Sequence, residues 1–352
     1  MEARGTGRVA TIVAIDALDD ADLEAWHRLR RANATFDSPY FHPEFARAVH
    51  ESGPRVDVII ERDEEGVRSL FAGHRVGSVF RPVGWPGADF QGPIGRGDEP
   101  IDARRLVRAA GMRAMAFDHL LEIPGFEPWI ESRRESPYVS VEGGLEAYLG
   151  RATKSGRDNM GQARRKANKA QAEHGELRFD AESTDANLLD AVIALKRARY
   201  VATGARDYFA APERIALLHR LLRTRVDGFA GVLSAVHVGP RLLAAHFGMR
   251  SGGVLHWWFP VYDPELASFS PGWVLLRELT AAAPELGLTR IDLGRGDDEY
   301  KRRAKTGQTI VCQGYVAESR VALATHRVET ALHALASRSS LPRRVRRIVR
   351  KR

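Results

Sequence analysis

The sequence predicts a mixed α/β fold of the α+β kind, in which mostly antiparallel strands are flanked by helices. Three features indicate it. The first 141 residues alternate short strands with amphipathic helices, residues 231–262 contain three strands in quick succession, and residues 268–306 read as helix, strand and helix. With 352 residues and 44 % apolar content, the chain is long enough for two domains with cores of ordinary size.

The first 141 residues contain the elements of one α/β domain. We expect strands at 9–15, 56–61, 67–83, 114–122 and 138–141, and helices at 19–31, 43–50 and 102–111. Residues 83–97 are rich in glycine and proline, so they are expected to form a loop. Nothing in this part predicts an anion-binding helix.

The next segment predicts helices followed by a three-stranded meander. We expect a long helix at 142–174, interrupted at Gly150 and Gly156, and further helices at 185–203 and 212–225. The strands are expected at 231–238, 242–250 and 254–262, with turns at Pro240 and at Gly252-Gly253. The long helix carries a basic run, which is typical of a solvated face; guidance of an anionic substrate is the alternative.

A helix predicted to begin at Ser270 follows the meander directly. Ser270 is a suitable N-cap, Pro271 fits the first turn, and Gly272 lets a bulky group approach the backbone. The free N–H groups and the positive end of such a helix suit a phosphate, although plain capping explains the same residues. Pro284 should stop or kink this helix near Ala283, before a strand at 288–293 and another helix start at Tyr300.

The run SPGWVLLRELTAAAPELGLTRIDLGRGDDEYKRR at 270–303 resembles the C-terminal signature of the BioF2-like acyltransferases. These are a branch of the GNAT superfamily that includes CelD-type exopolysaccharide proteins and is related to the FemAB peptidyltransferases. Stretches at 153–179, 188–204 and 241–272 are similar to the same family, so the resemblance covers about 145–316. Pro284, and Ala304-Lys305 where the family has an aromatic residue and glycine, depart from its pattern.

The resemblance implies two tandem GNAT-like domains. We place an N-terminal GNAT-like domain at 1–141, a C-terminal BioF2-like acetyltransferase domain at 142–318, and a helix with a basic tail at 319–352. The tail holds eight basic residues and no acid from Arg338 onward, which accounts for the whole net charge of +8. Such a tail remains solvated, or contacts an anionic membrane or nucleic acid. A neutral body makes nucleic acid the least favoured partner.

Composition also limits the compartment and the chemistry. No apolar run is long enough for a membrane span, and the first twenty residues lack the pattern of a secretory signal. The single cysteine, Cys312, rules out an intramolecular disulfide and a cysteine metal cluster, and it fits a reducing cytoplasm. We therefore expect a cytoplasmic protein, membrane-associated if the tail binds lipid, that needs no metal. Walker A, HExxH and G-x-S-x-G motifs are missing from the sequence.

The candidate catalytic residues lie on the meander and after the strand at 288–293. Acyl transfer from a thioester to an amine needs a proton acceptor and benefits from an acid for the thiolate. His246 and His256 lie on adjacent predicted strands and titrate near neutral pH, although strand histidines are more often structural. Asp292 is a candidate base, or else it caps a turn or pairs with Arg295. The resemblance implies that Tyr300 and Lys301 form the active-site pair, with Tyr300 as the acid.

The resemblance also implies an acyl-CoA donor. Its pyrophosphate would lie on the backbone of Ser270, Pro271, Gly272 and Trp273, and Arg302 and Arg303 would meet the adenosine phosphate.

We therefore predict an acyl-CoA-dependent N- or O-acyltransferase that transfers an acetyl group to a small molecule, sugar or glycan intermediate. Two alternatives remain open. One is FemAB-like transfer from aminoacyl-tRNA, and the other is a non-catalytic GNAT scaffold in polysaccharide assembly, tethered by the basic tail.

Overall fold

The computed structural model describes residues 8–97, 99–296 and 298–319. The predicted helix and basic tail at 319–352 therefore lie, except for Ser319, outside the described residues. The described strands are β1 (Val9–Ala14), β2 (Asp57–Asp63), β3 (Gly66–Val76), β4 (Val79–Pro82), β5 (Ile94–Gly95), β6 (Ala114–Leu121), β7 (Ile130–Ser140), β8 (Leu177–Asp180), β9 (Arg225–Val226), β10 (Phe229–Val238), β11 (Arg241–Ser251), β12 (Val254–Tyr262), β13 (Arg290–Asp292) and β14 (Gly307–Ala317). The described α-helices are α1 (Asp20–Arg31), α2 (Pro43–Ser52), α3 (Ala103–Ala109), α4 (Gly144–Arg151), α5 (Lys154–His174), α6 (Ala186–Thr203), α7 (Pro212–Arg223), α8 (Pro271–Ala282) and α9 (Glu299–Ala304).

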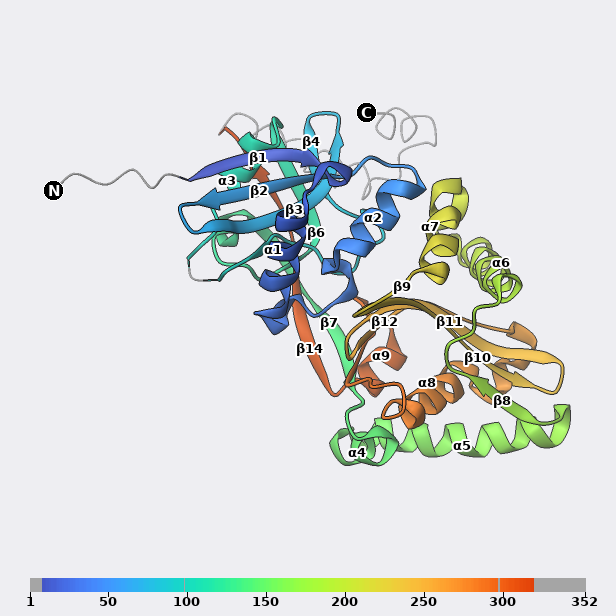
Figure 1. The fold of residues 1–352 in the computed structure, drawn as a ribbon. Coiled ribbons are helices and arrows are strands. Elements are labelled where there is room, and N and C mark those ends of the chain that lie inside the picture. Colours follow the sequence, from blue (N-terminus) through green and yellow to red (C-terminus); the bar gives the residue numbers. More distant parts are fainter. Residues whose placement is uncertain (1–7, 98, 297, 320–352) are drawn as a thin grey trace, which may run out of the picture.

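The predicted mixed α/β class is confirmed, with all described strands joined in one sheet. The strand order is β1-β2-β3-β4-β6-β14-β7-β13-β12-β11-β10-β8, and β5 and β9 pair beside β3 and β10. Most neighbours are antiparallel, and only β4–β6 and β12–β13 pair in parallel. Figure 1 shows the first part of this sheet with α1, α2 and α3, and the second part with α4 to α9.

The strand β14 joins the two parts of the sheet. It comes from the end of the described chain, yet it pairs antiparallel with β6 on one side and with β7 on the other. The strand β7 then pairs with β13, which continues into the meander β12-β11-β10. A division of the chain at residue 141 stays a prediction, because strands from both sides of that point share one hydrogen-bonded ladder.

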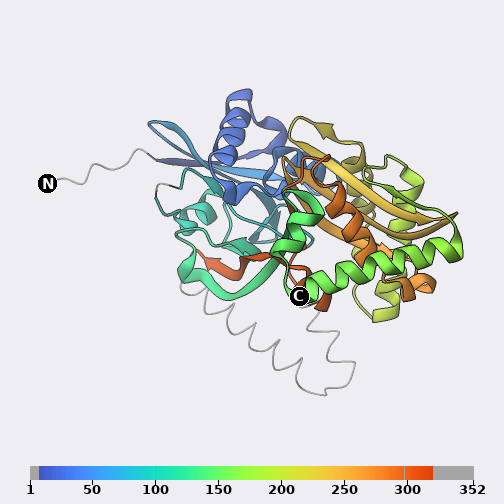
Figure 2. The ribbon, with the colours of Figure 1, turned by 90° about the horizontal axis from the view of Figure 1, so that it is seen from below.

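Helices cover both faces of the second part of the sheet. The helices α6 and α7 lie on one face of β10–β12, whereas α5 and α8 lie on the other (Figure 1). Seen from below, α5 runs along the outside of the molecule beside α8 (Figure 2). The apolar core follows this arrangement, since one buried cluster extends from the first part into the α6–α7 face and a second fills the space under α5 and α8.

Three local expectations need correction. The helix expected at 142–174 is two helices, and the break falls at Ala152 and Thr153 rather than at either glycine. Thr153 caps α5 by accepting a hydrogen bond from the Gly156 N–H, which explains why a new helix starts there. The loop expected at 83–97 contains the short strand β5, and the strand expected at 138–141 begins earlier, at Ile130. The helix α8 ends at Ala282, as Pro284 predicted.

The close packing around β14 gives a stability prediction. A Cβ atom added at Gly314 would lie 2.0 Å from the backbone oxygen of Trp129 and 2.7 Å from the Phe117 ring. We expect Gly314→Ala to lower the free energy of unfolding by about 1–3 kcal/mol, measured by denaturant titration, because backbone cannot move aside cheaply. Gly150→Ala is the control, since its Cβ meets no atom within 4 Å and alanine favours the helix by about 0.5–1 kcal/mol. Equal effects of the two changes would contradict this packing.

Candidate active site

The candidate site lies where the strands β12 and β13 separate. They pair in parallel through only three positions, the last of which is His256 opposite Asp292. The strand β12 continues to Tyr262, whereas β13 ends at Asp292. The last six residues of β12 thus present an edge that β13 does not cover. Ligands of α/β sheets gather beyond the carboxyl ends of parallel strands, so this opening is the natural place for a substrate.

The loop between β4 and β5 brings Asp89 to this opening. The His256 ring lies inside the sheet, fully buried, and its Nε2 donates to the Asp89 carboxylate at 3.0 Å. Gly294, just after β13, has no side chain, and a Cβ there would lie 2.4 Å from Asp89 Oδ2. The same loop accepts a hydrogen bond from Trp258 Nε1 on the Gly87 oxygen, at 2.9 Å. The first part of the chain therefore completes the site of the second.

A second histidine supports Asp89 from behind. His119 Nε2 lies 3.5 Å from the other Asp89 oxygen, and its Nδ1 lies 3.1 Å from Asp118 Oδ1. Gln91 donates to the same Asp118 oxygen at 2.8 Å. The His256 and His119 side chains are 0 % and 8 % exposed, while Asp89 is 26 % exposed. Asp118 is similarly exposed, at 27 %, but Asp89 is the carboxylate that lies against Gly294 at the opening.

The charge of Asp89 is stabilised by these neighbours. Burial alone would raise the pKa of Asp89, because a carboxylate loses water contacts. The hydrogen bond from His256 and the nearby His119 and Lys301 side chains oppose that effect, and the net pKa is lowered. The carboxylate therefore stays ionised at neutral pH and can accept a hydrogen bond from a substrate amine or hydroxyl.

Tyr300 and Lys301 both lie at this opening, on α9, but their surroundings differ. Burial, followed by the charges of Asp298 and Asp89, raises the pKa of Tyr300, so its hydroxyl keeps its proton at neutral pH. The Lys301 ammonium is buried and donates to the Gly294 and Arg295 oxygens, at 3.2 and 3.1 Å. Lys301 therefore holds the loop after β13 in place, and Tyr300 is the member of the pair that can exchange a proton.

The other two catalytic candidates are deeply buried. His246 on β11 stacks on Trp257, with the ring centroids 4.4 Å apart, and burial lowers its pKa to about 3. Asp292 accepts a hydrogen bond from Arg290 Nε at 3.0 Å, so the predicted pairing of Asp292 with Arg295 is wrong. Arg295 instead donates to the backbone carbonyl oxygen of Asp118. Burial raises the pKa of Asp292, and among the described residues its Oδ2 has no hydrogen-bond partner.

The N-terminus of α8 lies beyond the carboxyl end of β12. Ser270 occupies the N-cap position, but its side chain makes no capping bond, contrary to the sequence expectation. Its φ of 54° is left-handed, a conformation that only glycine adopts freely. A Cβ added at Gly272 would meet no atom within 4 Å, and Trp273 is partly exposed beside it. The first turn of α8 is thus open to an approaching group, whereas Pro271 is buried.

Arg302 and Arg303 do not lie with that helix turn. The Arg303 oxygen accepts from Thr153 and lies against Gly156, at the start of α5. Phe269, next to Ser270, contacts His174 at the other end of α5. Eighteen residues of helix separate those ends, which is about 27 Å at 1.5 Å per residue. The donor-binding residues proposed from the sequence therefore form two separate groups.

A family model and several solved structures resemble this chain. Residues 156–302 match the model of the acetyltransferase (GNAT) domain. These residues form a GNAT acetyltransferase domain. The matched region contains the meander, α8, β13 and most of α9. The match supports an acyltransferase enzyme. No curated protein matches the chain.

The structures resemble the whole chain rather than the GNAT domain alone. The crystal structure of FemX is 9 % identical, with a TM-score of 0.58, and the match covers 84 % of this chain and 95 % of FemX. A tandem GNAT protein from the clavulanic acid biosynthesis pathway is 11 % identical, with a TM-score of 0.50, covering 89 % and 99 %. At these identities the likeness concerns the fold, and it includes the first part of the chain.

Sequence reasoning missed the residues that lie outside the GNAT domain. Asp89 and His119 belong to a glycine- and proline-rich loop and to β6, and neither follows a motif. The Gly-rich composition of 83–97 was the available signal, because such loops often approach a site closely.

No group of three or more metal-ligating side chains occurs among the described residues. No described helix is long and apolar enough to cross a membrane.

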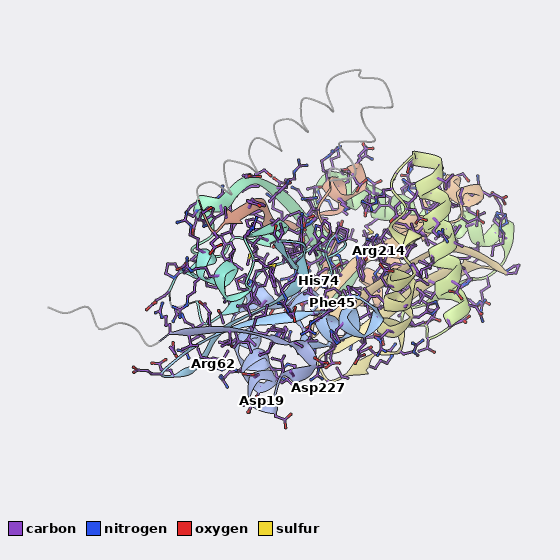
Figure 3. The ribbon with its side chains drawn as sticks, turned by 90° about the horizontal axis from the view of Figure 1, so that it is seen from above. Asp19, Phe45, Arg62, His74, Arg214 and Asp227 are labelled. Carbon is purple, nitrogen blue, oxygen red and sulfur yellow. The ribbon has the colours of Figure 1, made fainter. Side chains whose placement is uncertain are left out.

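The loop of Asp89 packs against both parts of the molecule. Seen from above, Phe45 and His74 lie in the first part, while Arg214 lies on α7 of the second (Figure 3). Gly84 and Gly87 of the loop fit against Phe45 and Tyr208, one from each part.

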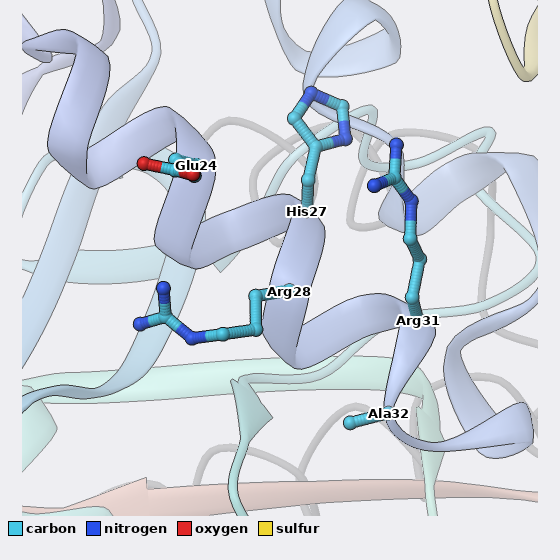
Figure 4. A pocket seen from close by; sticks show the side chains of 5 residues that line it. All are labelled: Glu24, His27, Arg28, Arg31 and Ala32. Atoms are coloured by element: carbon cyan, nitrogen blue, oxygen red, sulfur yellow. The ribbon is translucent and has the colours of Figure 1, made fainter.

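A hollow of about 700 Å³ lies elsewhere, along α1, and Figure 4 shows that Glu24, His27, Arg28, Arg31 and Ala32 line it. Its wall is one face of a single helix, so it encloses no substrate and is not the site.

The hydrogen bond between Asp89 and the buried His256 gives a prediction about pH. We expect Asp89→Asn to lower the free energy of unfolding by about 1–3 kcal/mol at pH 7, since it removes the carboxylate to which His256 donates a hydrogen bond. The folded pKa of Asp89 lies below its unfolded value, so its contribution is present above about pH 4 and is lost as the pH falls through the folded pKa. Urea titrations of both proteins at pH 7 and pH 3 measure the difference.

Asp190→Asn is the control for that prediction. Asp190 forms an equally short bond to His219, at 2.9 Å, but it is 62 % exposed, so a change within about 0.5 kcal/mol is expected. Similar losses in the two variants, or a loss for Asp89→Asn that does not shrink at pH 3, would refute the role of burial.

Proposed function

We propose that this chain is an acyl-CoA-dependent N- or O-acyltransferase that transfers an acetyl group to an amine or a hydroxyl. The observation that carries the proposal is the parting of β12 and β13 beside the open first turn of α8. In this arrangement the diphosphate of CoA would lie at the first turn of α8 beside the backbone N–H of Gly272, where helix polarity favours an anion. The thioester would extend along the uncovered edge of β12.

The side chains at the opening suit acyl transfer. A backbone N–H on the uncovered edge of β12 could polarise the thioester carbonyl. The ionised Asp89 would accept a hydrogen bond from the attacking amine or hydroxyl and orient it. Tyr300 keeps its proton at neutral pH and would donate it to the leaving thiolate. His246, fully buried and with a lowered pKa, would have a structural role in this scheme.

The acceptor class rests on the family resemblance. A BioF2-like or CelD-type enzyme would act on a sugar or glycan intermediate of exopolysaccharide synthesis, in the cytoplasm or at the membrane surface. The basic tail that would contact an anionic membrane lies outside the described residues.

Transfer of an aminoacyl group from aminoacyl-tRNA is the second candidate. The likeness to FemX over almost the whole chain favours it, although at 9 % identity that likeness concerns the fold. Under this alternative the chain would bind tRNA with an affinity that falls steeply with salt concentration.

Donor binding is tested by thermal unfolding of the full chain with acetyl-CoA. At a hundred times its dissociation constant, a ligand stabilises the folded state by about 2.7 kcal/mol, which raises Tm by a few degrees. We expect this shift in the wild type and its loss in Gly272→Asp, because the new carboxylate would repel the diphosphate. An acid in a first helical turn is itself favourable, so the variant should fold.

Gly161→Asp is the matched control, since Gly161 lies on α5 with no atom closer than 3.9 Å to a Cβ placed there. Its Tm shift should equal that of the wild type. The same shift in Gly272→Asp would rule out donor binding at α8. A chain that ignores millimolar acetyl-CoA but binds tRNA in low salt would favour the aminoacyl alternative.

A further inference from the structure

A lysine on α6 faces the uncovered edge of β12. Lys196 extends its ammonium to within 3.4 Å of the Pro260 oxygen, and the rings of Tyr200 and Phe259 lie 5.9 and 6.0 Å away. Pro260 lies four residues beyond His256, on the part of β12 that has no β13 partner. The amine therefore lies beside the strand edge along which the proposed function places the thioester.

Lys196 makes no ion pair with any residue that the structure describes, unlike Lys301 nearby. It is partly buried, and the charged groups that act on it come from three elements of the site. Arg199 on α6 and Lys301 on α9 repel its ammonium, whereas Asp298 before α9 and Asp89 from the β4–β5 loop attract it. A partly buried ammonium with one carbonyl partner is poorly compensated.

These surroundings increase the fraction of Lys196 that carries a neutral amine. Burial, then Arg199 and Lys301, lower the pKa of Lys196 to about 8, and the two acids oppose this only in part. About half of the Lys196 side chains are then unprotonated at pH 8, whereas an ordinary lysine, with a pKa near 10.4, is almost fully charged. Neutral amines are the nucleophilic form, so Lys196 is prepared to react with an electrophile.

The two faces of the sheet bring donor and amine to the same edge. The helix α8, whose first turn is the proposed diphosphate site, lies on one face of the meander, and α6 lies on the other (Figure 1). A donor that passes from α8 through the opening between β12 and β13 reaches the face on which Lys196 lies. The amine occupies the side from which an acceptor would approach.

We propose that Lys196 is a self-acylation site, at which the chain transfers the acyl group of its own bound donor to itself. This inference rests on the proposed acyl-CoA function. The neutral Nζ attacks the thioester carbonyl carbon, a C–N bond forms and the C–S bond breaks. The nitrogen gives up its extra proton, which reaches the departing thiolate directly or through Asp89 or Asp298. The products are an Nε-acyl-lysine and free CoA thiol, and no further reactant is needed.

The test needs no knowledge of the natural acceptor. The full chain is incubated with acetyl-CoA at pH 8, and acetylated peptides are quantified over time by mass spectrometry. We expect Lys196 to gain one acetyl group at least ten times faster than Lys154, an exposed lysine of α5. The rate should saturate with acetyl-CoA, rise with pH to a plateau above about pH 8, and vanish in Gly272→Asp but not in Gly161→Asp.

Two results would overturn the inference. Acetylation of Lys196 no faster than that of Lys154, or a rate that grows linearly with acetyl-CoA and persists in Gly272→Asp, would mean ordinary solution chemistry. Unmodified Lys196 together with a normal acetyl-CoA shift in Tm would refute self-acylation and leave the proposed function standing. A missing Tm shift would instead show that the proposed function itself has failed. Lys196→Arg keeps the charge and should abolish the modified peptide.

Discussion

The site depends on one partly buried hydrogen bond, between Asp89 of the first part and His256 of the second. Each partner would be costly to bury alone, because a carboxylate and an imidazole both lose hydrogen bonds to water. Together with His119 they hold the β4–β5 loop against the point where β12 and β13 separate. The GNAT domain provides the opening, but the residue that reaches solvent there comes from outside it. An isolated fragment of 156–302 would therefore lack part of its own site.

The sequence was most informative where periodicity and turn residues coincide. The meander, its turns and the end of α8 at Pro284 were predicted within a few residues, because alternation and proline act locally. The insertion of β14 between β6 and β7 could not be predicted, since strand pairing over such separations leaves no local pattern. The site shows the same division. Tyr300, Asp292 and Gly272 were named from a contiguous stretch, whereas Asp89, His119 and Lys196 reach the opening only through the tertiary fold.

Other predictions concern the donor and the start of α8. Arg302 and Arg303 follow Tyr300 directly, and the Arg303 backbone lies at the start of α5, away from Ser270, so their contact with the adenosine phosphate stays a prediction. Ser270 itself was expected to cap α8 with its hydroxyl, and it adopts a left-handed backbone instead. Asp292 is buried with one unpartnered oxygen among the described residues. Both features are unfavourable for stability. Ser270 lies at the mouth of the proposed donor site, and Asp292 belongs to the last residue pair of β12 and β13. Unfavourable local geometry of this kind concentrates at functional sites.

The position of β14 has a consequence for synthesis of the chain. Ribosomes deliver the N-terminal residues first, so β6 and β7 emerge long before residues 307–317 that must lie between them. Until then both strands have an open edge, and their only direct connection is the chain at 122–129. The first part of the protein therefore cannot complete its sheet while it is being made. Translation must nearly finish before either part reaches its final structure, which makes the nascent chain dependent on protection of those two edges.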